Sequence, residues 1–292
     1  MSETSQEPWT VLRLLNWTNE YLTQGGADSP RLQAQMLLAH VLGCSRIQLY
    51  TRFDYQPTPE QLAQFRELVR RARLLEPVAY LVGRKEFFSL EFKVTPDVLV
   101  PRAETEQLVL QAVDHLKALG RPGTMWDAYT GSGCIGIATA HQLPDLRLVG
   151  SDISAPAIAI ACENAQNLGV SDRAKFLVGD AMNLPPEAAD LVPFDVITGN
   201  PPYIRPTDGI GPGVKHEPAV ALYGGSDGLE FIRDTIAKAP NFLRSGGLLA
   251  MEYGYAMADE VLGMIKAQGN YQEPRLLLDH QGIERAVVVL RK

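Results

Sequence analysis

The stretch ITGNPPYIRP, residues 197–206, places an asparagine, two prolines and a tyrosine directly after an apolar run. Proline has a restricted φ and no backbone N–H, so two prolines in succession end a strand and leave carbonyl groups in fixed positions. Asn200 adds a side-chain amide oxygen, and Tyr203 adds a planar ring. Together these groups can accept the two N–H bonds of a planar NH₂ group and stack against it.

A planar nitrogen, such as that of an amide or an exocyclic aromatic amine, is a poor nucleophile because its lone pair is delocalised. Chemistry at such a nitrogen needs a site that holds both N–H bonds, and we expect Asn200 Oδ1 and the Pro201 carbonyl to accept one each. Pro202 keeps the carbonyls fixed, and Tyr203 stacks on the planar group. Positioning of this kind contributes up to about 7–11 kcal/mol in ideal cases. No dedicated general base is expected, because the proton can leave once the nitrogen is cationic.

A second motif, DAYTGSGCIGIATA at 127–140, contains Gly131, Gly133 and Gly136 in the order G-x-G-x-x-G. Glycine lets the backbone turn sharply and approach a ligand closely. Asp152 follows at a distance of about 20 residues, where an acid can accept the hydroxyls of a ribose. Each motif alone also fits a plain turn, but the acid at this spacing favours a nucleotide-like ligand.

Two acids favour S-adenosylmethionine over NAD as that ligand. Asp127 precedes the glycine loop, and we expect it to reach the ammonium group of the cofactor. Asp180 ends a third apolar run, where it can meet the adenine amine. A NAD site uses a helix N-terminus for the pyrophosphate, and no other feature of the chain indicates hydride chemistry.

Short strands alternate with helices from residue 122 onward. The predicted strands are TMWDAY, LRLVGSD, AKFLVGD, FDVITGN and GGLLAMEY, with helices over 155–168 and 228–239 between them, and EPRLLLD with ERAVVVLRK predicts a hairpin of two edge strands. This alternation indicates an α/β fold with a doubly wound parallel sheet. Ligands of such sheets bind at the carboxyl ends of the strands near the switch point. The glycine loop and the turn at Asn200 are therefore expected to face one crevice.

The first 85 residues predict a helical bundle. Ser29 and Thr58 stand where N-caps belong, Pro30 and Pro59 follow at the first helical positions, and Gln61 completes a capping box with Thr58. No catalytic constellation occurs here, so we predict a recognition domain over 1–85. Residues 86–104 are predicted to form a linking β-hairpin, and 105–292 the catalytic domain.

The composition is that of a globular chain of 292 residues with 46% apolar residues and a net charge of −7. A net acidic chain is a poor candidate for general nucleic-acid binding, and we interpret the basic run at 66–73 as a solvated helix face. The chain shows no signal peptide and no apolar run of about 20 residues, so we expect a cytoplasmic monomer that does not contact membranes. Reduced, mostly buried thiols are expected for Cys44, Cys134 and Cys162, and structural or surface roles for the histidines at 40, 115, 141, 216 and 280.

Six blocks of the sequence occur in the same order in the HemK/PrmC-type release-factor glutamine methyltransferases, which the chain resembles over nearly its whole length. The blocks are EPVAYLVGRKEFFSLEFKV (76–94), LVPRAETEQLV (99–109), TGSGCIGIA (130–138), SDIS (151–154), GNPPYI (199–204) and HEPAVALYGGSDGL (216–229). The NPPY motif alone is less specific than these six blocks together, since adenine DNA methyltransferases have a similar motif.

The resemblance implies a Rossmann-like class I methyltransferase domain behind a helical domain that recognises the substrate. It implies methyl transfer from S-adenosyl-L-methionine to the glutamine of the GGQ loop of peptide-chain release factors. It also implies that Arg102 and Glu104 pair at a structural corner and that Glu217 orders a covering loop. With the acids named above, the expected cofactor-binding set is Asp127, Tyr129, Thr130, Gly131, Ser132, Gly133, Asp152, Asp180, Ala181 and Asn200.

The sequence departs from the family at two places in the cofactor pocket. Tyr129 stands where the first loop glycine belongs, and Ala181 stands where a larger apolar residue is usual. The departure at Tyr129 leaves open a non-catalytic binding module with weakened cofactor affinity. The planar-amine chemistry leaves open two other substrates, a glutamine of a ribosomal protein or an adenine base.

Overall fold

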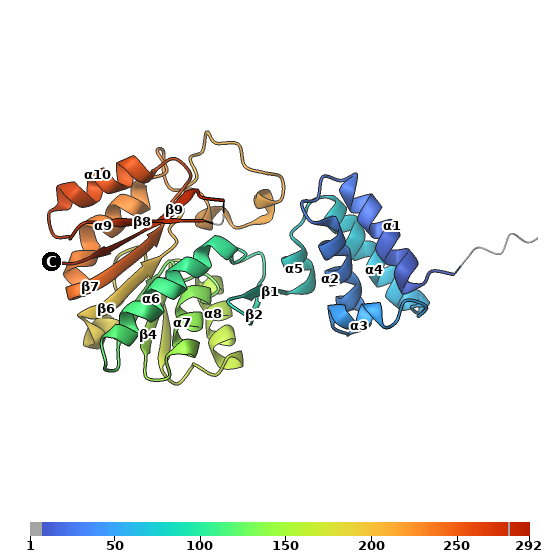
Figure 1. Cartoon of the computed structure of the whole chain (residues 1–292), viewed down its shortest axis with the longest axis horizontal. Helices are drawn as coiled ribbons and strands as arrows, with labels where there is room; N and C mark the ends of the chain where they lie inside the picture. The colour runs from blue at the N-terminus through green and yellow to red at the C-terminus, as the bar shows by residue number, and fades with distance from the viewer. Residues whose placement is uncertain (1–7, 280) are drawn as a thin grey trace, which may run out of the picture. The chain divides into compact units, whose positions relative to one another are not determined.

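The computed structural model describes residues 8–279 and 281–292, so His280 lies outside the described residues. The chain divides into two compact units. Within the described residues, the first comprises the chain up to Gly83 together with Gly211–His216, and the second comprises Arg84–Ile210 and Glu217–Lys292. Figure 1 draws both units.

The first unit is the predicted helical bundle. Its helices are α1 (Val11–Thr23), α2 (Pro30–Leu42), α3 (Arg46–Tyr50), α4 (Pro59–Arg73) and α5 (Val78–Val82). Thr58 and Gln61 form the predicted capping box, whereas the Ser29 side chain makes no capping hydrogen bond. The buried side chains of these helices form a core of their own, which includes Val11, Leu37, Phe65 and Leu81.

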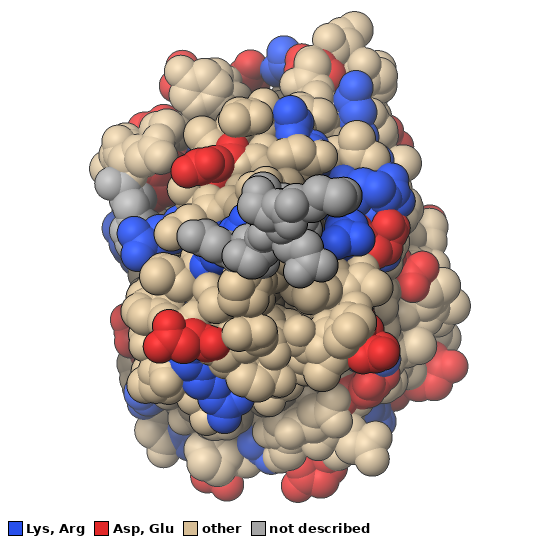
Figure 2. Space-filling view, turned by 90° about the vertical axis from the view of Figure 1, so that its right-hand side faces the viewer, with Lys and Arg blue, Asp and Glu red and all other residues tan. Residues whose placement is uncertain are grey.

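The basic run on α4 contains four arginines, of which Arg66 and Arg70 are exposed and Arg71 and Arg73 are half-buried. Arg70 pairs with Glu67, Arg71 pairs with Glu76, and the Arg73 guanidinium lies over the ring of Tyr21. On the face drawn in Figure 2, Lys and Arg side chains lie among Asp and Glu side chains. These local partners agree with a solvated face, which stays a prediction.

The second unit begins with the β-hairpin, which the sequence placed over 86–104 as a linker. The strands are shorter and start earlier, β1 (Arg84–Phe87) pairing antiparallel with β2 (Leu90–Lys93). Phe87 and Phe92 are buried in the core of this unit, so apolar packing attaches the hairpin to the second unit.

A seven-stranded sheet forms the centre of the second unit, with the order β5-β4-β3-β6-β7-β9-β8. The strands are β3 (Thr124–Ala128), β4 (Arg147–Asp152), β5 (Ala174–Val178), β6 (Phe194–Gly199), β7 (Leu243–Glu252), β8 (Arg275–Leu278) and β9 (Glu284–Leu290). The first five in this order are parallel, and β9 is antiparallel to both β7 and β8. The predicted C-terminal hairpin forms from β8 and β9. Of these two strands, β8 lies at the edge of the sheet, whereas β9 does not, because it also pairs with β7.

Helices cover both faces of this sheet (Figure 1): α6 (Glu106–Ala118), α7 (Cys134–Gln142) and α8 (Ala155–Asn167) on one side, α9 (Glu230–Phe242) and α10 (Ala258–Gln268) on the other. Successive residues of a strand face opposite sides. Met125 of β3 packs with the α6 and α7 core, and Trp126 packs with the α9 and α10 core. The doubly wound α/β prediction is confirmed, and the switch point lies at β3, where the chain order reverses.

Candidate functional site

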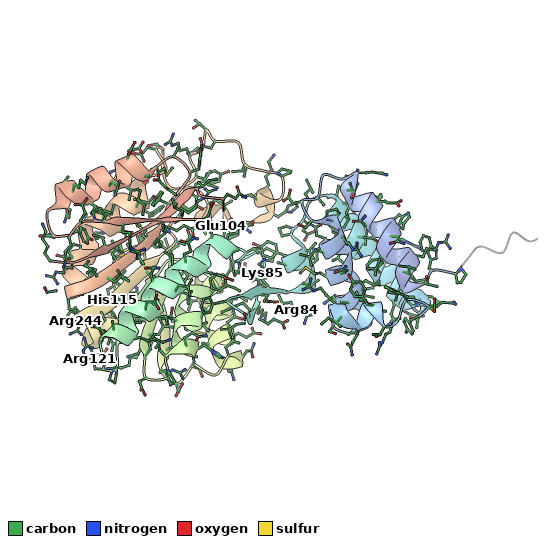
Figure 3. All side chains as sticks on the ribbon, viewed as in Figure 1. Arg84, Lys85, Glu104, His115, Arg121 and Arg244 are labelled. Carbon is green, nitrogen blue, oxygen red and sulfur yellow. The ribbon has the colours of Figure 1, made fainter. Side chains whose placement is uncertain are left out.

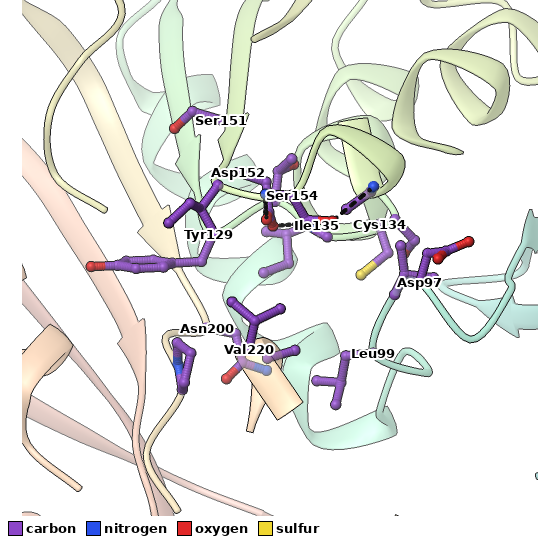
Figure 4. Close-up of a pocket in the computed structure, with 18 of the residues that line it drawn as sticks. Asp97, Leu99, Tyr129, Cys134, Ile135, Ser151, Asp152, Ser154, Asn200 and Val220 are labelled. Carbon is purple, nitrogen blue, oxygen red and sulfur yellow. Dashed lines mark hydrogen bonds between the residues drawn. The ribbon is translucent and has the colours of Figure 1, made fainter. Parts of the chain in front are cut away.

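A cavity that opens to solvent lies at the carboxyl ends of β3, β4 and β6, where doubly wound sheets bind their ligands. Figure 4 shows Tyr129, Asp152 and Asn200 around it. Of the predicted residues, those that line it are Tyr129, Thr130, Gly131, Ser132, Asp152, Asp180, Ala181, Asn200 and Pro202. Asp127, Gly133, Pro201 and Tyr203 are not among its lining residues.

Asp127 lies beneath the glycine loop, fully buried, where it cannot meet a cofactor ammonium as the sequence predicted. Its Oδ2 accepts hydrogen bonds from Thr130 Oγ1 at 2.7 Å and from the Gly136 N–H at 3.1 Å, and its Oδ1 accepts one from Thr198 Oγ1 at 2.7 Å. Burial raises the pKa of Asp127 to about 6, against the opposing effect of these bonds. Asp127 thus ties the loop to β3, α7 and β6 and is not among the residues that line the cavity.

The glycines have backbone and packing roles. Gly133 has a φ of +81°, the left-handed region that favours glycine, and is the N-cap of α7. A Cβ on Gly136 would lie 2.8 Å from Leu148 and 3.2 Å from the Asp127 side chain. The missing side chains therefore let α7 pack closely on the sheet, as in nucleotide-binding folds.

Asp152 ends β4 and faces the cavity. Its Oδ2 accepts a hydrogen bond from the Gly131 N–H at 2.9 Å, and its Oδ1 accepts one from the Ser154 N–H at 2.9 Å. Burial raises its pKa, although these backbone bonds oppose the rise. Each oxygen keeps a lone pair, so the carboxylate can accept two further hydroxyl groups.

Tyr129 lines the cavity, and its side chain extends from the loop toward α9. Its hydroxyl lies 3.1 Å from Thr235 Oγ1 on α9, and its ring meets Phe231 edge to face at 6.1 Å. Gly199 leaves room for the ring, because a Cβ there would lie 3.3 Å from Tyr129 Cδ2. The φ of +59° is strained for a side chain other than glycine, and the contacts with α9 offset that cost.

The turn at Asn200 follows β6 directly and is held by a neighbouring segment. The Ile204 N–H donates to the Leu222 carbonyl at 2.8 Å, and the Gly224 N–H donates to the Ile204 carbonyl at 3.0 Å. A Cβ on Gly224 would lie 2.4 Å from the Pro202 carbonyl oxygen. The GNPPYI and LYGGSDG blocks of the sequence are therefore one packed structure.

Comparison with known proteins gives full-length relatives. A family model described as the PrmC N-terminal domain matches residues 13–83, and one described as a methyltransferase domain matches 122–286. A protein of Rhodopirellula baltica named release factor glutamine methyltransferase is 44% identical over 98% of both chains. Proteins of the same name from Geobacter sulfurreducens and Vibrio cholerae are 40% and 38% identical, each over 96% of both chains.

The chain belongs to the release factor glutamine methyltransferase family.

Solved structures agree on the fold of this family member. The hMettl16 catalytic domain, in complex with a MAT2A 3′UTR hairpin, superposes with a TM-score of 0.55 at 16% identity, covering 77% of this chain and 79% of that one. At this identity the similarity shows a shared fold only. In the part of the chain that the structure describes, no helix has the length and apolar character of a membrane span.

The family block PRAETE does not contain the ion pair that the resemblance implied. Arg102 pairs with Glu217, Nη2 to Oε1, at 2.5 Å, and Glu104 is exposed. Glu217 is buried and also accepts the Val100 N–H at 3.2 Å. Because Arg102 lines the cavity, this pair attaches the start of the 217–229 segment beside the site.

Sequence reasoning missed two residues that touch the turn. Thr105, a buried lining residue, lies 3.5 Å from Asn200 Nδ2 through its Oγ1. Glu252, the last residue of β7, accepts a hydrogen bond from the Tyr203 hydroxyl at 3.2 Å. An acid at the end of a parallel strand was the available signal, but GGLLAMEY was interpreted only as a strand.

Proposed function

We propose that the protein transfers a methyl group from S-adenosyl-L-methionine to the side-chain amide nitrogen of the GGQ-loop glutamine of peptide-chain release factors. One observation carries the proposal: the glycine loop with Asp152 and the rigid turn at Asn200 line the same cavity. The names of the full-length relatives support the choice of substrate and do not favour a ribosomal protein or an adenine base.

The residues of the cavity fit S-adenosylmethionine. The free lone pairs of Asp152 suit the two ribose hydroxyls, and Gly131 offers no Cβ to obstruct a close ligand. Ile153, an exposed apolar residue beside Asp152, and Ala181 give adenine an apolar surface next to Asp180. Ala181 has a φ of +48°, which a larger side chain would adopt at greater cost.

Residues Gly131, Asp152 and Ala181 would hold S-adenosylmethionine, which when bound would supply an electrophilic methyl group and would keep the electron pair of the broken carbon–sulfur bond on its sulfur. Asn200 Oδ1 and the Pro201 carbonyl accept the two N–H bonds of the glutamine amide and direct the nitrogen toward the methyl group. The nitrogen then releases a proton to solvent. The two prolines contribute by fixing these oxygens before the substrate arrives.

The test is methyl transfer to a purified release factor, followed by mass spectrometry of the peptide that contains the GGQ sequence. We expect one methyl group on the glutamine, and none when that glutamine is replaced by alanine in the substrate. Transfer to a ribosomal protein or to DNA adenine, with none to the release factor, would contradict the proposal. If S-adenosylmethionine bound but no substrate were methylated, the protein would be a binding module.

A further inference from the structure

Glu252 is a buried carboxylate behind the turn that holds the substrate. It is 4% exposed and ends β7, the strand next to β6, which leads into Asn200. Its Oε2 accepts a hydrogen bond from Thr105 Oγ1 at 2.6 Å, and its Oε1 accepts one from the Tyr203 hydroxyl at 3.2 Å. Both donors belong to, or touch, the residues expected to bind the substrate amide.

No ion pair within residues 8–279 and 281–292 reaches Glu252. The charged and titratable groups that face it are Glu104 before α6, Arg285 on β9, Cys134 on α7 and Tyr203. Burial raises the pKa of Glu252, and Glu104 adds to the rise, while the hydrogen bonds from Thr105 and Tyr203 and the charge of Arg285 oppose it. A carboxylate kept without a cationic partner costs stability, which is typical of groups retained for function.

When Glu252 is ionised, its carboxylate fixes the direction of every hydrogen bond in the network. A carboxylate only accepts, so Thr105 and Tyr203 must donate their hydroxyl protons to it. The Thr105 oxygen is then left only with lone pairs for its other neighbour, so Asn200 must turn its NH₂ group toward it, in agreement with the 3.5 Å contact between Asn200 Nδ2 and Thr105 Oγ1. Burial and the Glu252 charge raise the pKa of Tyr203, so its hydroxyl remains a donor.

This fixed direction decides which end of the Asn200 amide faces the cavity. With Nδ2 turned to Thr105, Oδ1 is available to accept the N–H of a planar substrate amide. An inverted amide would present N–H groups to another N–H group and could not bind it. The ring of Tyr203 packs closely against the backbone of Gly254, because a Cβ at Gly254 would lie 3.0 Å from Tyr203 Cδ2.

We propose that Glu252 is a positioning residue which, through the hydroxyl of Thr105, holds the Asn200 amide with its oxygen toward the substrate and, through its second oxygen, holds the ring of Tyr203. The inference rests on the proposed function for its catalytic consequence. Its structural content, the coupling of Glu252 to the Asn200 amide, does not depend on which substrate is methylated.

The kinetic test uses Thr105→Val, which removes the hydroxyl at nearly constant volume, Thr105→Ser, which restores it, and Glu252→Gln. We expect kcat to fall about 10- to 100-fold in Thr105→Val, because small misplacements of reacting groups have effects of that size. Thr105→Ser recovers kcat to within about threefold, and the KM for S-adenosylmethionine changes little in each variant. Thr139→Val is the matched control, since Thr139 is buried on α7 and its hydroxyl donates to the Ile135 carbonyl of the same helix.

The second readout is independent of activity. In protein labelled with ¹⁵N-asparagine, the Asn200 side-chain signal, assigned by its loss in Asn200→Ser, should shift with pH as Glu252 ionises. The shift should be absent in Glu252→Gln, and the signal should move in Thr105→Val but not in Thr139→Val. A titration that persists in Glu252→Gln would overturn the inference.

The outcomes separate the inference from the proposed function. If the wild-type protein methylates the release factor and the kcat of Thr105→Val is no lower than that of Thr139→Val, the inference is overturned and the proposed function stands. If the wild-type protein does not methylate a release factor, the proposed function fails, and the asparagine signal alone decides whether Glu252 controls the Asn200 amide.

Discussion

Buried carboxylates at the two ends of one sheet differ in what surrounds them. At the amino end of β6, Asp195 is fully buried, and its oxygens meet Arg121 at 2.5 Å, Arg244 at 2.6 Å and the Thr124 N–H at 2.9 Å. Figure 3 shows Arg121 and Arg244 at one end of the second unit and Glu104 toward the other. At the carboxyl end, Asp127, Asp152 and Glu252 bond to hydroxyl and backbone N–H groups.

The pKa values follow this difference. Burial alone would raise the pKa of Asp195, but Arg121, the Thr124 N–H and Arg244 lower it below its usual value. Burial raises the pKa at Asp127, Asp152 and Glu252. The amino end of the sheet is therefore arranged for stability. The carboxyl end keeps charged groups that cost stability, as binding and catalytic sites do.

Loss of the Asn200 side-chain oxygen should have the largest effect at the carboxyl end. We expect Asn200→Ala to lower kcat about 100- to 1,000-fold, comparable with the loss of one oriented hydrogen-bonding group in other active sites. The unfolding free energy should change by less than about 1 kcal/mol, because the side chain makes only the long contact to Thr105. Single-turnover kinetics and urea unfolding measure the two quantities. A wild-type kcat in Asn200→Ala would show that the Asn200 side chain does not contribute to catalysis.

Loss of the Asp195 charge should have the opposite profile. Asp195→Asn is expected to lower the unfolding free energy by about 2–4 kcal/mol at pH 7, because Arg121, Arg244 and the Thr124 N–H lose their partner. Because the pKa of Asp195 is lower in the folded than in the unfolded protein, its carboxylate contributes stability at pH values above the unfolded-state pKa. This contribution is lost as the pH falls through the folded-state pKa. The difference from the wild-type protein should therefore shrink on acidification below 3.8. Transfer per folded molecule should be unchanged; a fall in kcat would remove the contrast between the two ends.

Asp127 sharpens the contrast, because its pKa is raised. A group with a raised pKa contributes stability at pH values below its unfolded-state pKa, and the contribution is lost as the pH rises through its folded-state pKa. For Asp127 these two pKa values are 3.8 and about 6. Asp127→Asn should flatten the stability profile in that window. It should also weaken S-adenosylmethionine binding about 3- to 10-fold, since the loop loses a charged acceptor. Urea unfolding at several pH values measures the stability profile, and calorimetry measures the binding. If the dependence of stability on pH in Asp127→Asn were identical to that of the wild-type protein, Asp127 would not have the raised pKa.

Tyr129 offers the smallest effect. Tyr129→Phe removes the contact with Thr235 Oγ1 and keeps the ring against Phe231, so the unfolding free energy should fall by about 0.5–1.5 kcal/mol. Cofactor affinity should stay within about threefold, because the hydroxyl points to α9. Tyr129→Gly is the paired variant: tighter binding in it than in Tyr129→Phe would mean that the ring does obstruct the site.

The sequence predicted the sheet and most of the cavity because both follow from local patterns. Alternating strands and helices located β3 to β7, and their carboxyl ends brought Asp152 and Asn200 to one cavity. It could not predict the role of Asp127, since the bonds to Thr130, Gly136 and Thr198 depend on how three elements pack. Glu252 was missed for the same reason: its partners lie 147 and 49 residues away in the chain.

Calorimetric titration of the wild-type protein, Asp152→Asn and Asp195→Asn with S-adenosylmethionine tests the contrast most directly, at a temperature where all three are folded by circular dichroism. We expect the wild-type protein and Asp195→Asn to bind alike, with a dissociation constant on the order of micromolar. Asp152→Asn should bind about 10- to 100-fold more weakly, because each hydrogen bond to a charged group contributes about 1.5–3 kcal/mol. No heat from the wild-type protein, or an equal loss in Asp195→Asn and Asp152→Asn, would contradict the assignment of the carboxyl end of the sheet as the methyl-donor site.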